Sequence, residues 1–195
     1  MAPLSHDDGQ KLAGLAAAVV GARLSARPPP AWPPPASALR ERGATFVTLE
    51  TTGNLRGCIG TLEASRPLYL DVIRNTVRAM SDPRLPPVIA DEWPVLDVCV
   101  SVLSAPDPVD VLGRAELLAV LRSGTDGLIL TDGVRRATFL PTVWLKLPDP
   151  DDFLAALLVK GGWPPDGWPN GLRPLRYTAT EYHDRSPRSP LPGAG

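Results

Sequence analysis

The segment Leu55-Arg56-Gly57-Cys58-Ile59-Gly60 combines residue types that could carry out chemistry. Side chains alternate between the two faces of a β-strand, so Arg56 and Cys58 would share one face. A guanidinium beside a thiol favours the thiolate, which is the reactive form of cysteine. The flanking Gly57 and Gly60 have no side chains, so a ligand or another backbone could come close. The segment therefore predicts a small active site, with Arg56 and Cys58 as catalytic residues and the two glycines as substrate-binding residues.

Each of these residues also has a structural interpretation. A free cysteine most often packs as a small buried hydrophobe, and Cys58 could do only that. Arg56 could form an ion pair with a carboxylate such as Asp82, or it could bind a carboxylate or phosphate of a substrate, since a guanidinium suits both uses. Asp82 and Arg84 follow a predicted helix, and they have the same alternatives of closing the turn or contacting a substrate.

The remaining cysteine and the two histidines offer less. Cys99 lies beside Asp97 in a predicted strand, and this negative charge opposes thiolate formation, so we expect Cys99 to be inert. His6 and His183 lie near the two ends of the chain and show no HxxxH or HxE spacing, which argues against a zinc or iron site. We therefore predict no metal and no cofactor. A dyad of Cys58 with His183 would require the fold to bring the two together.

Composition excludes several classes of function. The chain has 195 residues, of which 44% are hydrophobic, and its net charge is -1, so it lacks the basic excess of a general nucleic-acid binder. Two cysteines without a CxxC pair suit a reducing compartment, which favours the cytoplasm. The apolar stretch at 12–20 is too short to span a bilayer and follows acidic residues, so we predict neither a signal peptide nor a membrane anchor.

The elements that position the site follow from periodicity and turn residues. Strands and helices alternate without a regular βαβ rhythm, which predicts an α+β fold on a largely antiparallel sheet with flanking helices. A hairpin followed by a helix occurs twice, which suggests an internal duplication. The expected helices span 6–25, 67–80, 116–121 and 149–160, the expected hairpins pair 45–49 with 55–61 and 128–131 with 134–139, and a further strand spans 96–103.

The 24 prolines gather at the joints between these elements. The run at 28–36 is predicted to be a stiff proline-rich connector. The tail at 184–195 has low hydrophobicity and is predicted to be disordered. The interpretation is a single domain over residues 1–183 that contains the connector.

Six segments, in this order along the chain, resemble the AMMECR-type domain family, known in prokaryotes as protein A of the AmmeMemoRadiSam system. Three departures from the family pattern are Leu85, Thr142 and Gly161, whereas Arg56 and Cys58 both match. The matching segments are GATFVTL (43–49), LRGCIG (55–60), DPRLPP (82–87), VSVLS (100–104), TFLPTVW (138–144) and residues 153–163.

The resemblance implies a compact α+β protein of two closely packed subdomains, with a cleft between them that the LRGCIG segment lines. It also implies a Memo-type protein and a radical-SAM enzyme as partners. The chain itself has no CxxxCxxC run, so it is not the radical-SAM enzyme. The family supplies no settled activity.

Two hypotheses of function follow. In the first, Cys58 is a nucleophile or covalent acceptor in a cytosolic enzyme, and Arg56 activates it or binds a small anionic substrate. In the second, the protein is a non-catalytic ligand-binding or adaptor module for those partners, with Arg56 as the anchor and Cys58 as part of the lining. Nucleic-acid binding ranks third because of the charge balance.

Overall fold

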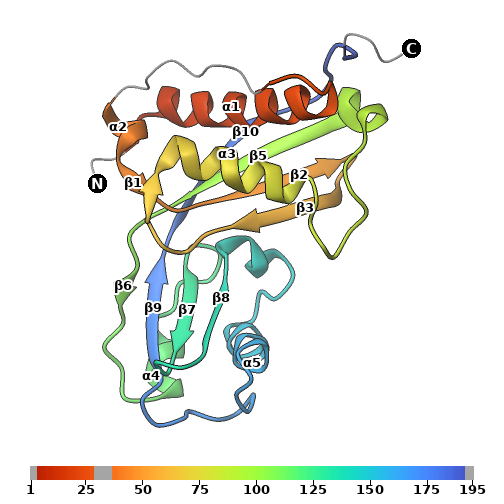
Figure 1. Cartoon of the computed structure of the whole chain (residues 1–195). Helices are drawn as coiled ribbons and strands as arrows, with labels where there is room; N and C mark the ends of the chain where they lie inside the picture. Colours follow the sequence, from red (N-terminus) through yellow and green to blue (C-terminus); the bar gives the residue numbers. More distant parts are fainter. Residues whose placement is uncertain (1–3, 29–36, 192–195) are drawn as a thin grey trace. The chain divides into compact units, whose positions relative to one another are not determined.

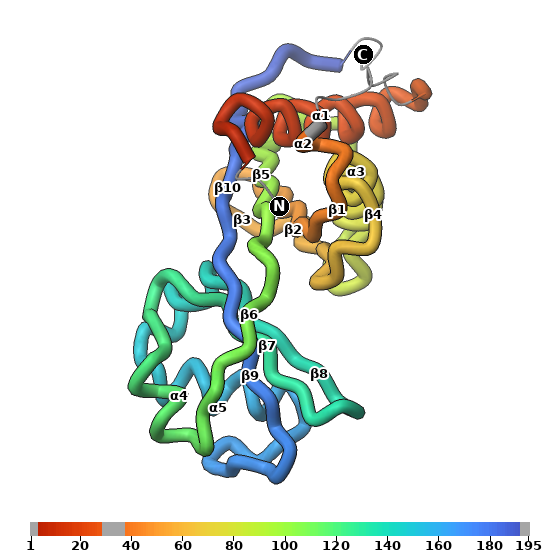
Figure 2. Tube along the Cα trace, turned by 90° about the vertical axis from the view of Figure 1, so that its left-hand side faces the viewer, coloured from red at the N-terminus to blue at the C-terminus, as the bar shows by residue number. Residues whose placement is uncertain are grey.

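The computed structural model describes residues 4–28 and 37–191, which form two compact units (Figures 1 and 2). Unit 1 contains residues 1–103 and 180–195, and unit 2 contains residues 104–179. The predicted α+β class is confirmed, because each unit holds an antiparallel sheet and helices that pack on it. The predicted connector lies outside the described residues from position 29 onward.

In its described residues, unit 1 contains a four-stranded sheet, a short two-stranded ladder of β1 with β4, and three α-helices. Its elements are α1 (His6–Leu24), α2 (Ser37–Arg40), β1 (Arg42–Gly43), β2 (Thr45–Thr51), β3 (Asn54–Gly60), β4 (Arg66–Pro67), α3 (Leu68–Ala79), the 3-10 helix η1 (Ala90–Val95), β5 (Leu96–Leu103) and β10 (Ala179–Asp184).

The sheet of unit 1 has the strand order β10-β5-β2-β3. The central strand β2 pairs antiparallel with both β3 and β5. The hairpin turn between β2 and β3 uses Thr52 (φ 49°) and Gly53 (φ 80°), and positive φ at both positions matches the twist of the flanking strands. The predicted first hairpin is therefore confirmed, with its strands extended to the turn.

Helices α1 and α3 lie together against one face of this sheet (Figure 1). Helix α1 begins where the Ser5 hydroxyl accepts a hydrogen bond from the Asp8 amide, which is a common N-terminal helix cap. In β2, Val47 and Leu49 point to the helices and are fully buried, whereas the alternate residue Thr48 is only partly buried. One face of the sheet thus belongs to an aliphatic core, and the other carries polar side chains.

Unit 2 is a second antiparallel sheet with the strand order β6-β9-β7-β8. Its core gathers aromatic side chains, with the rings of Trp144 and Phe153 stacked at a centroid distance of 3.8 Å. Its elements are β6 (Asp107–Pro108), α4 (Arg114–Val120), β7 (Gly127–Thr131), β8 (Arg136–Phe139), the 3-10 helix η2 (Pro141–Leu145), α5 (Pro150–Lys160) and β9 (Arg173–Tyr177).

The chain returns from unit 2 to complete unit 1. Strand β10 lies beside β5 at the edge of the unit 1 sheet. The first part of the predicted disordered tail then makes defined contacts, because Arg188 stacks on Trp93 and the Trp93 indole donates to the Ser189 carbonyl at 2.9 Å. Within residues 4–28 and 37–191, no helix has the length and apolar character needed to cross a membrane.

Candidate functional site

The register of unit 1 places both cysteines on the polar face of the sheet. Thr48 is opposite Cys58 on β3 and opposite Cys99 on β5. Directly opposed residues point to the same side, so these three side chains form one row, and we call this side of the sheet the thiol face. The Thr48 hydroxyl donates to the Cys58 Sγ at 3.4 Å. Two free cysteines separated by a whole strand, with Cα atoms about 9.5 Å apart, cannot form a disulfide with each other without a large rearrangement.

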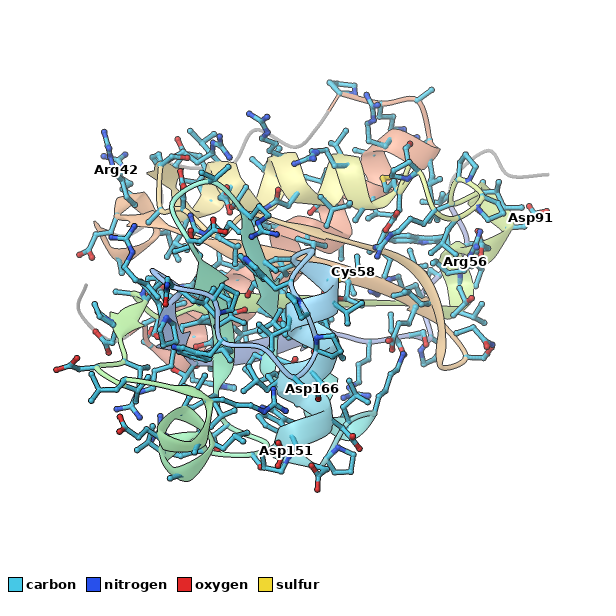
Figure 3. The ribbon with its side chains drawn as sticks, turned by 90° about the horizontal axis from the view of Figure 1, so that it is seen from below. Arg42, Arg56, Cys58, Asp91, Asp151 and Asp166 are labelled. Carbon is cyan, nitrogen blue, oxygen red and sulfur yellow. The ribbon has the colours of Figure 1, made fainter. Side chains whose placement is uncertain are left out.

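A β-bulge changes the position of Arg56. Leu49 pairs with Gly57 and Glu50 pairs with Leu55, so Arg56 is an extra residue of β3 without a partner on β2. The ladder with β2 is irregular at this point, so strand pairing does not fix the place of the Arg56 side chain. Arg56 instead lies next to the segment that carries Asp91 (Figure 3).

The guanidinium of Arg56 forms an ion pair with Glu92 of η1. Its Nε and Nη2 both donate to the carboxylate, the latter at 3.1 Å, and Nη2 also reaches the carbonyls of Pro86 and Pro87 at 3.4 Å. These hydrogen bonds raise the pKa of Arg56 and lower the pKa of Glu92. The structural alternative for Arg56 is thus realised, with Glu92 in place of Asp82 as its partner.

Asp82 and Arg84 hold the backbone of Cys58 from the outer edge of the sheet. Asp82 is buried and accepts from the Cys58 amide at 3.0 Å, while Arg84 Nη2 donates to the Cys58 carbonyl at 3.0 Å. Arg84 also donates to Asp82 through Nη2 at 2.6 Å and Nε at 2.9 Å, which lowers the pKa of Asp82. β3 is an edge strand, so this clamp satisfies polar groups that would otherwise be open to solvent.

Among the predicted site residues, the structure therefore brings Cys58, Asp82 and Arg84 together and gives Arg56 a different partner. Arg84 is the guanidinium that sits at Cys58, and 64% of its side chain is exposed. The sequence contained Arg84 as a substrate-binding candidate, but its spacing could not show that it reaches Cys58.

Gly57 and Gly60 are needed for packing within the chain. A Cβ added to Gly57 would lie 1.9 Å from the carbonyl oxygen of Ala79, at the end of α3. A Cβ added to Gly60 would lie 2.2 Å from the ring of Phe46. Close approach of another backbone, one of the two uses expected of these glycines, is thus seen at Gly57. Their substrate-binding role stays a prediction.

Thiolate formation is disfavoured at Cys99, for a reason that differs in part from the one the sequence suggested. Burial, followed by the charge of Glu181, raises the pKa of Cys99 to about 12. The Asp97 carboxylate, which was expected to oppose ionisation, accepts from the Ser186 amide at 2.6 Å. His183 lies on β10 close to Cys99 and Glu181, whereas the sequence had considered it as a partner of Cys58.

Two residues that sequence reasoning missed are Thr48 and Glu92. Thr48 contacts the sulfur of Cys58, and only the strand register shows it. Glu92 had a local signal, because its carboxylate reaches back to the Ile89 amide at 2.9 Å, as an acidic residue in the first turn of a helix often does. That signal predicts a helix start but does not identify Arg56 as the partner of Glu92.

Comparison with known proteins gives consistent results. The AMMECR1 family model matches residues 13–182. A protein of Methanothermobacter thermautotrophicus is 38% identical over 190 residues, which cover 94% of this chain and 97% of that protein. A protein of Thermofilum pendens is 35% identical over 204 residues, with 96% and 95% covered. The crystal structure of the uncharacterized protein PH0010 from Pyrococcus horikoshii superposes with a TM-score of 0.80 at 33% identity, covering 93% of this chain and 94% of that one.

Proposed function

This chain belongs to the AMMECR1 family, and from that premise we propose that its thiol face binds a small anionic molecule beside Cys58. In this proposal Cys58 is a nucleophile or covalent acceptor toward that molecule, and Arg84 binds its anionic group. Arg84 thereby takes the part that the sequence had given to Arg56.

The observation that supports the proposal is the way in which Arg84 is held. Its Nε and Nη2 are fixed by buried Asp82 and by the Cys58 carbonyl, so the Nη1 side of the guanidinium points away from that carboxylate. A guanidinium fixed in this way, yet mostly exposed, is suited to a carboxylate or phosphate group of a ligand. A ligand bound there lies next to the backbone of Cys58, whose thiol is half-buried.

A second candidate function is ligand binding without chemistry, as an adaptor. The Arg56–Glu92 ion pair favours it, because it engages the charge that was expected to activate the thiol. In this function Arg84 anchors the ligand, and Cys58 only lines the site.

We also propose that the protein works in the cytoplasm with a Memo-type protein and a radical-SAM enzyme. The compartment is supported by the two free cysteines, which lie on strands separated by β2 and so do not pair within the chain. The partners rest on the family resemblance of the segments described above. To test this part, the tagged chain is purified from its native cell, and the two proteins are sought among the proteins that purify with it. Cells that lack these two proteins serve as the control.

The test of the site compares two alkylating agents of similar size, anionic iodoacetate and neutral iodoacetamide, with the modified peptides identified by mass. If Arg84 attracts anions, the wild-type protein favours iodoacetate at Cys58, and Arg84→Gln lowers the iodoacetate-to-iodoacetamide rate ratio by up to about fivefold, since an exposed charge contributes about 1 kcal/mol or less. Arg84→Lys should keep part of the preference.

Arg56→Gln is the matched control, because it also removes a guanidinium that forms an ion pair with a carboxylate between α3 and β5. It should leave the ratio at Cys58 unchanged. An equal ratio in wild type and Arg84→Gln would contradict anion binding at Arg84. If Cys58 reacts only after denaturation, its role as a nucleophile is wrong, and the adaptor function remains.

A further inference from the structure

β10 runs beside β5 at the edge of the unit 1 sheet (Figure 2). Three side chains of metal-binding type meet there. One ligand atom each from Cys99, Glu181 and His183 lies within 4.8 Å of the other two. The His183 Nε2 and the Glu181 carboxylate are 3.7 Å apart. Glu181 and His183 are two residues apart on β10, so both project to the same side of the sheet, toward the neighbouring Cys99.

We propose that Cys99, Glu181 and His183, here called the β10 triad, bind a divalent late first-row metal ion, with Zn²⁺ as the reference ion. Thiolate, imidazole and carboxylate are the three ligand types that zinc takes in proteins, at about 2.0–2.3 Å. Tetrahedral bonds of that length place ligand atoms roughly 3.3–3.8 Å apart. The His183–Glu181 distance is already in this range.

The side chains have room to close around an ion. The exposed fractions of the His183 and Glu181 side chains are 37% and 35%, so both can change rotamer, and an ion can enter from solvent. Cys99 is more buried and supplies the fixed ligand of the β10 triad. Three protein ligands leave one coordination position for water, which is the pattern of an open zinc site.

The charges around Cys99 also suit a cation. Glu181 and Glu50 both place negative charge near its sulfur. When the ion binds, the Cys99 thiol loses its proton to solvent, a sulfur–metal bond forms, and no electron is transferred. The ion then neutralises the charges that oppose the thiolate in the free protein.

The mixture of ligand types sets the selectivity. Mg²⁺ and Ca²⁺ take oxygen ligands, and only one member of the β10 triad supplies oxygen. Sulfur and nitrogen favour zinc, cobalt, nickel and copper. The ligands come from strands that are far apart in the sequence, which is why the search for HxxxH or HxE spacing argued against a metal site.

The test is a competition titration of the full chain with Zn²⁺ against a chromophoric chelator, followed by Co²⁺ as a spectroscopic probe. We expect one ion per chain and a sulfur-to-cobalt charge-transfer band. Cys99→Ala should abolish the band, and Cys99→Ala, His183→Gln and Glu181→Gln should each weaken Zn²⁺ binding by at least about tenfold, because each removes a direct ligand and even outer-shell changes cost 10- to 100-fold.

The chain provides matched controls, since Cys58 and His6 are its only other cysteine and histidine. Cys58→Ala and His6→Gln should bind Zn²⁺ as tightly as wild type. Cys58→Ala also separates this proposal from the previous one, because it removes alkylation at Cys58 but leaves the β10 triad intact. If Cys99→Ala does not fold, as judged by circular dichroism, the exposed His183→Gln variant decides the question. Zn²⁺ affinity no better than millimolar, or an equal loss in the controls, would overturn the proposal.

Discussion

Unit 1 and unit 2 repeat one order of elements with different side chains. In unit 1 the hairpin β2–β3 is followed by α3 and then by β5, which pairs antiparallel with β2. In unit 2 the hairpin β7–β8 is followed by α5 and then by β9, which pairs antiparallel with β7. In both units the later strand joins the free edge of the first hairpin strand. The predicted repetition of a hairpin and a helix is confirmed at the level of topology.

The two units differ in what they bury. The core of unit 1 is largely aliphatic and lies on one side of its sheet, so the other side is free to carry polar residues such as Thr48 and Cys58. In unit 2, residues 127–130 of β7 are all buried, and the core is built around the rings of Trp144 and Phe153. With the same topology, the central strand β2 of unit 1 therefore alternates between buried and half-buried residues, whereas β7 of unit 2 is buried along residues 127–130.

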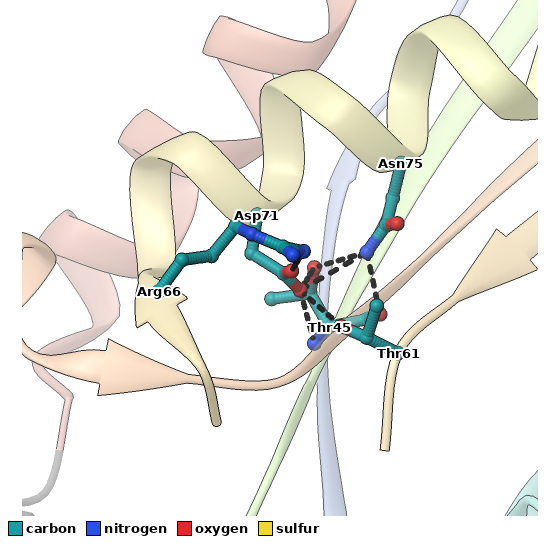
Figure 4. A network of polar contacts seen from close by, with 5 residues as sticks. All are labelled: Thr45, Thr61, Arg66, Asp71 and Asn75. Carbon is teal, nitrogen blue, oxygen red and sulfur yellow. Dashed lines mark hydrogen bonds and ion pairs between the residues drawn. The ribbon is translucent and has the colours of Figure 1, made fainter. Parts of the chain in front are cut away.

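Buried carboxylates show the same contrast. In unit 1, Asp71 accepts hydrogen bonds from Thr45, Thr61, Arg66 and Asn75, which come from four different segments (Figure 4). In unit 2, buried Asp126 accepts from the amide and guanidinium of Arg122, four residues before it. Unit 1 uses buried charge to fix distant segments around its sheet, whereas unit 2 uses it to close a local turn.

The largest expected effect concerns the aromatic core of unit 2. Phe153→Ala should lower the free energy of unfolding by about 4 kcal/mol, because Phe153 is fully buried and stacked on Trp144. Leu12→Ala, which deletes a fully buried aliphatic side chain of unit 1, should cost about 3 kcal/mol. Hydrogen exchange reports the two units separately, with faster exchange of β7–β9 amides in the first variant and of β2–β5 amides in the second. A cost below about 2 kcal/mol for Phe153→Ala would show that the ring stack is not the centre of that core.

The second prediction compares the two carboxylates. Asp71→Asn removes the negative charge that the surrounding donors share and puts an NH₂ donor in place of one of the two acceptor oxygens, so it should cost about 3 kcal/mol in chemical denaturation. Asp126→Asn should cost about 1 kcal/mol, since its partner Arg122 is 56% exposed and solvent screens the pair. Equal costs would mean that long-range and local carboxylates contribute alike, and the contrast between the units would fail.

The third prediction concerns close backbone approach beside the candidate site. Gly57→Ala should cost about 2 kcal/mol, because the new methyl group would meet the backbone oxygen of Ala79, which cannot rotate away. Gly113→Ala in unit 2 is the matched control. It has open space around the added carbon, so its cost should stay below about 1 kcal/mol and come from the poorer N-cap preference of alanine before α4. Thermal melts of the two variants, measured side by side, provide the check.

The smallest effect is a pH dependence in unit 1. The hydrogen bond from Arg84 lowers the pKa of Asp82, so the folded state holds this carboxylate ionised more strongly than the unfolded chain does. The stabilisation is complete above the ordinary pKa of about 4 and is lost as pH falls below it. Asp82→Asn should therefore flatten the acid decline of β2–β3 amide protection below about pH 4. An unchanged slope would show that other carboxylates govern it.

Local patterns predicted the fold wherever one element could be identified from its own residues. Both hairpins and the helices at 6–25, 67–80 and 149–160 are present because periodicity and turn residues specify them locally. β9 was missed because Pro174 argues against a strand. The Pro174 carbonyl accepts from the Val109 amide, so it points away from β7 and toward the side of β6. The missing N–H of Pro174 lies on that same side, where β6 has already ended, and therefore removes no bond to β7.

The residue types of the site were predictable from the sequence, but the contacts between those residues were not. The sequence singled out Cys58, Asp82 and Arg84, and the structure brings them together. It allowed Arg56 an ion pair with a carboxylate but could not identify Glu92 as the partner, because that residue lies 36 residues away. The β10 triad depends on two strands meeting at a sheet edge, which is a property of the tertiary structure alone.

The division of unit 1 by unit 2 has a consequence for synthesis on the ribosome. β5 is complete once residue 103 has emerged, but its neighbour β10 follows only after the whole of residues 104–179. At 5–20 residues per second, the outer edge of β5 stays uncovered for roughly 4–15 s in each nascent chain. An open edge is a template for pairing with another chain. Crowded polysomes would therefore expose this protein to misassembly at β5, and its folding yield should depend on how fast unit 2 is translated.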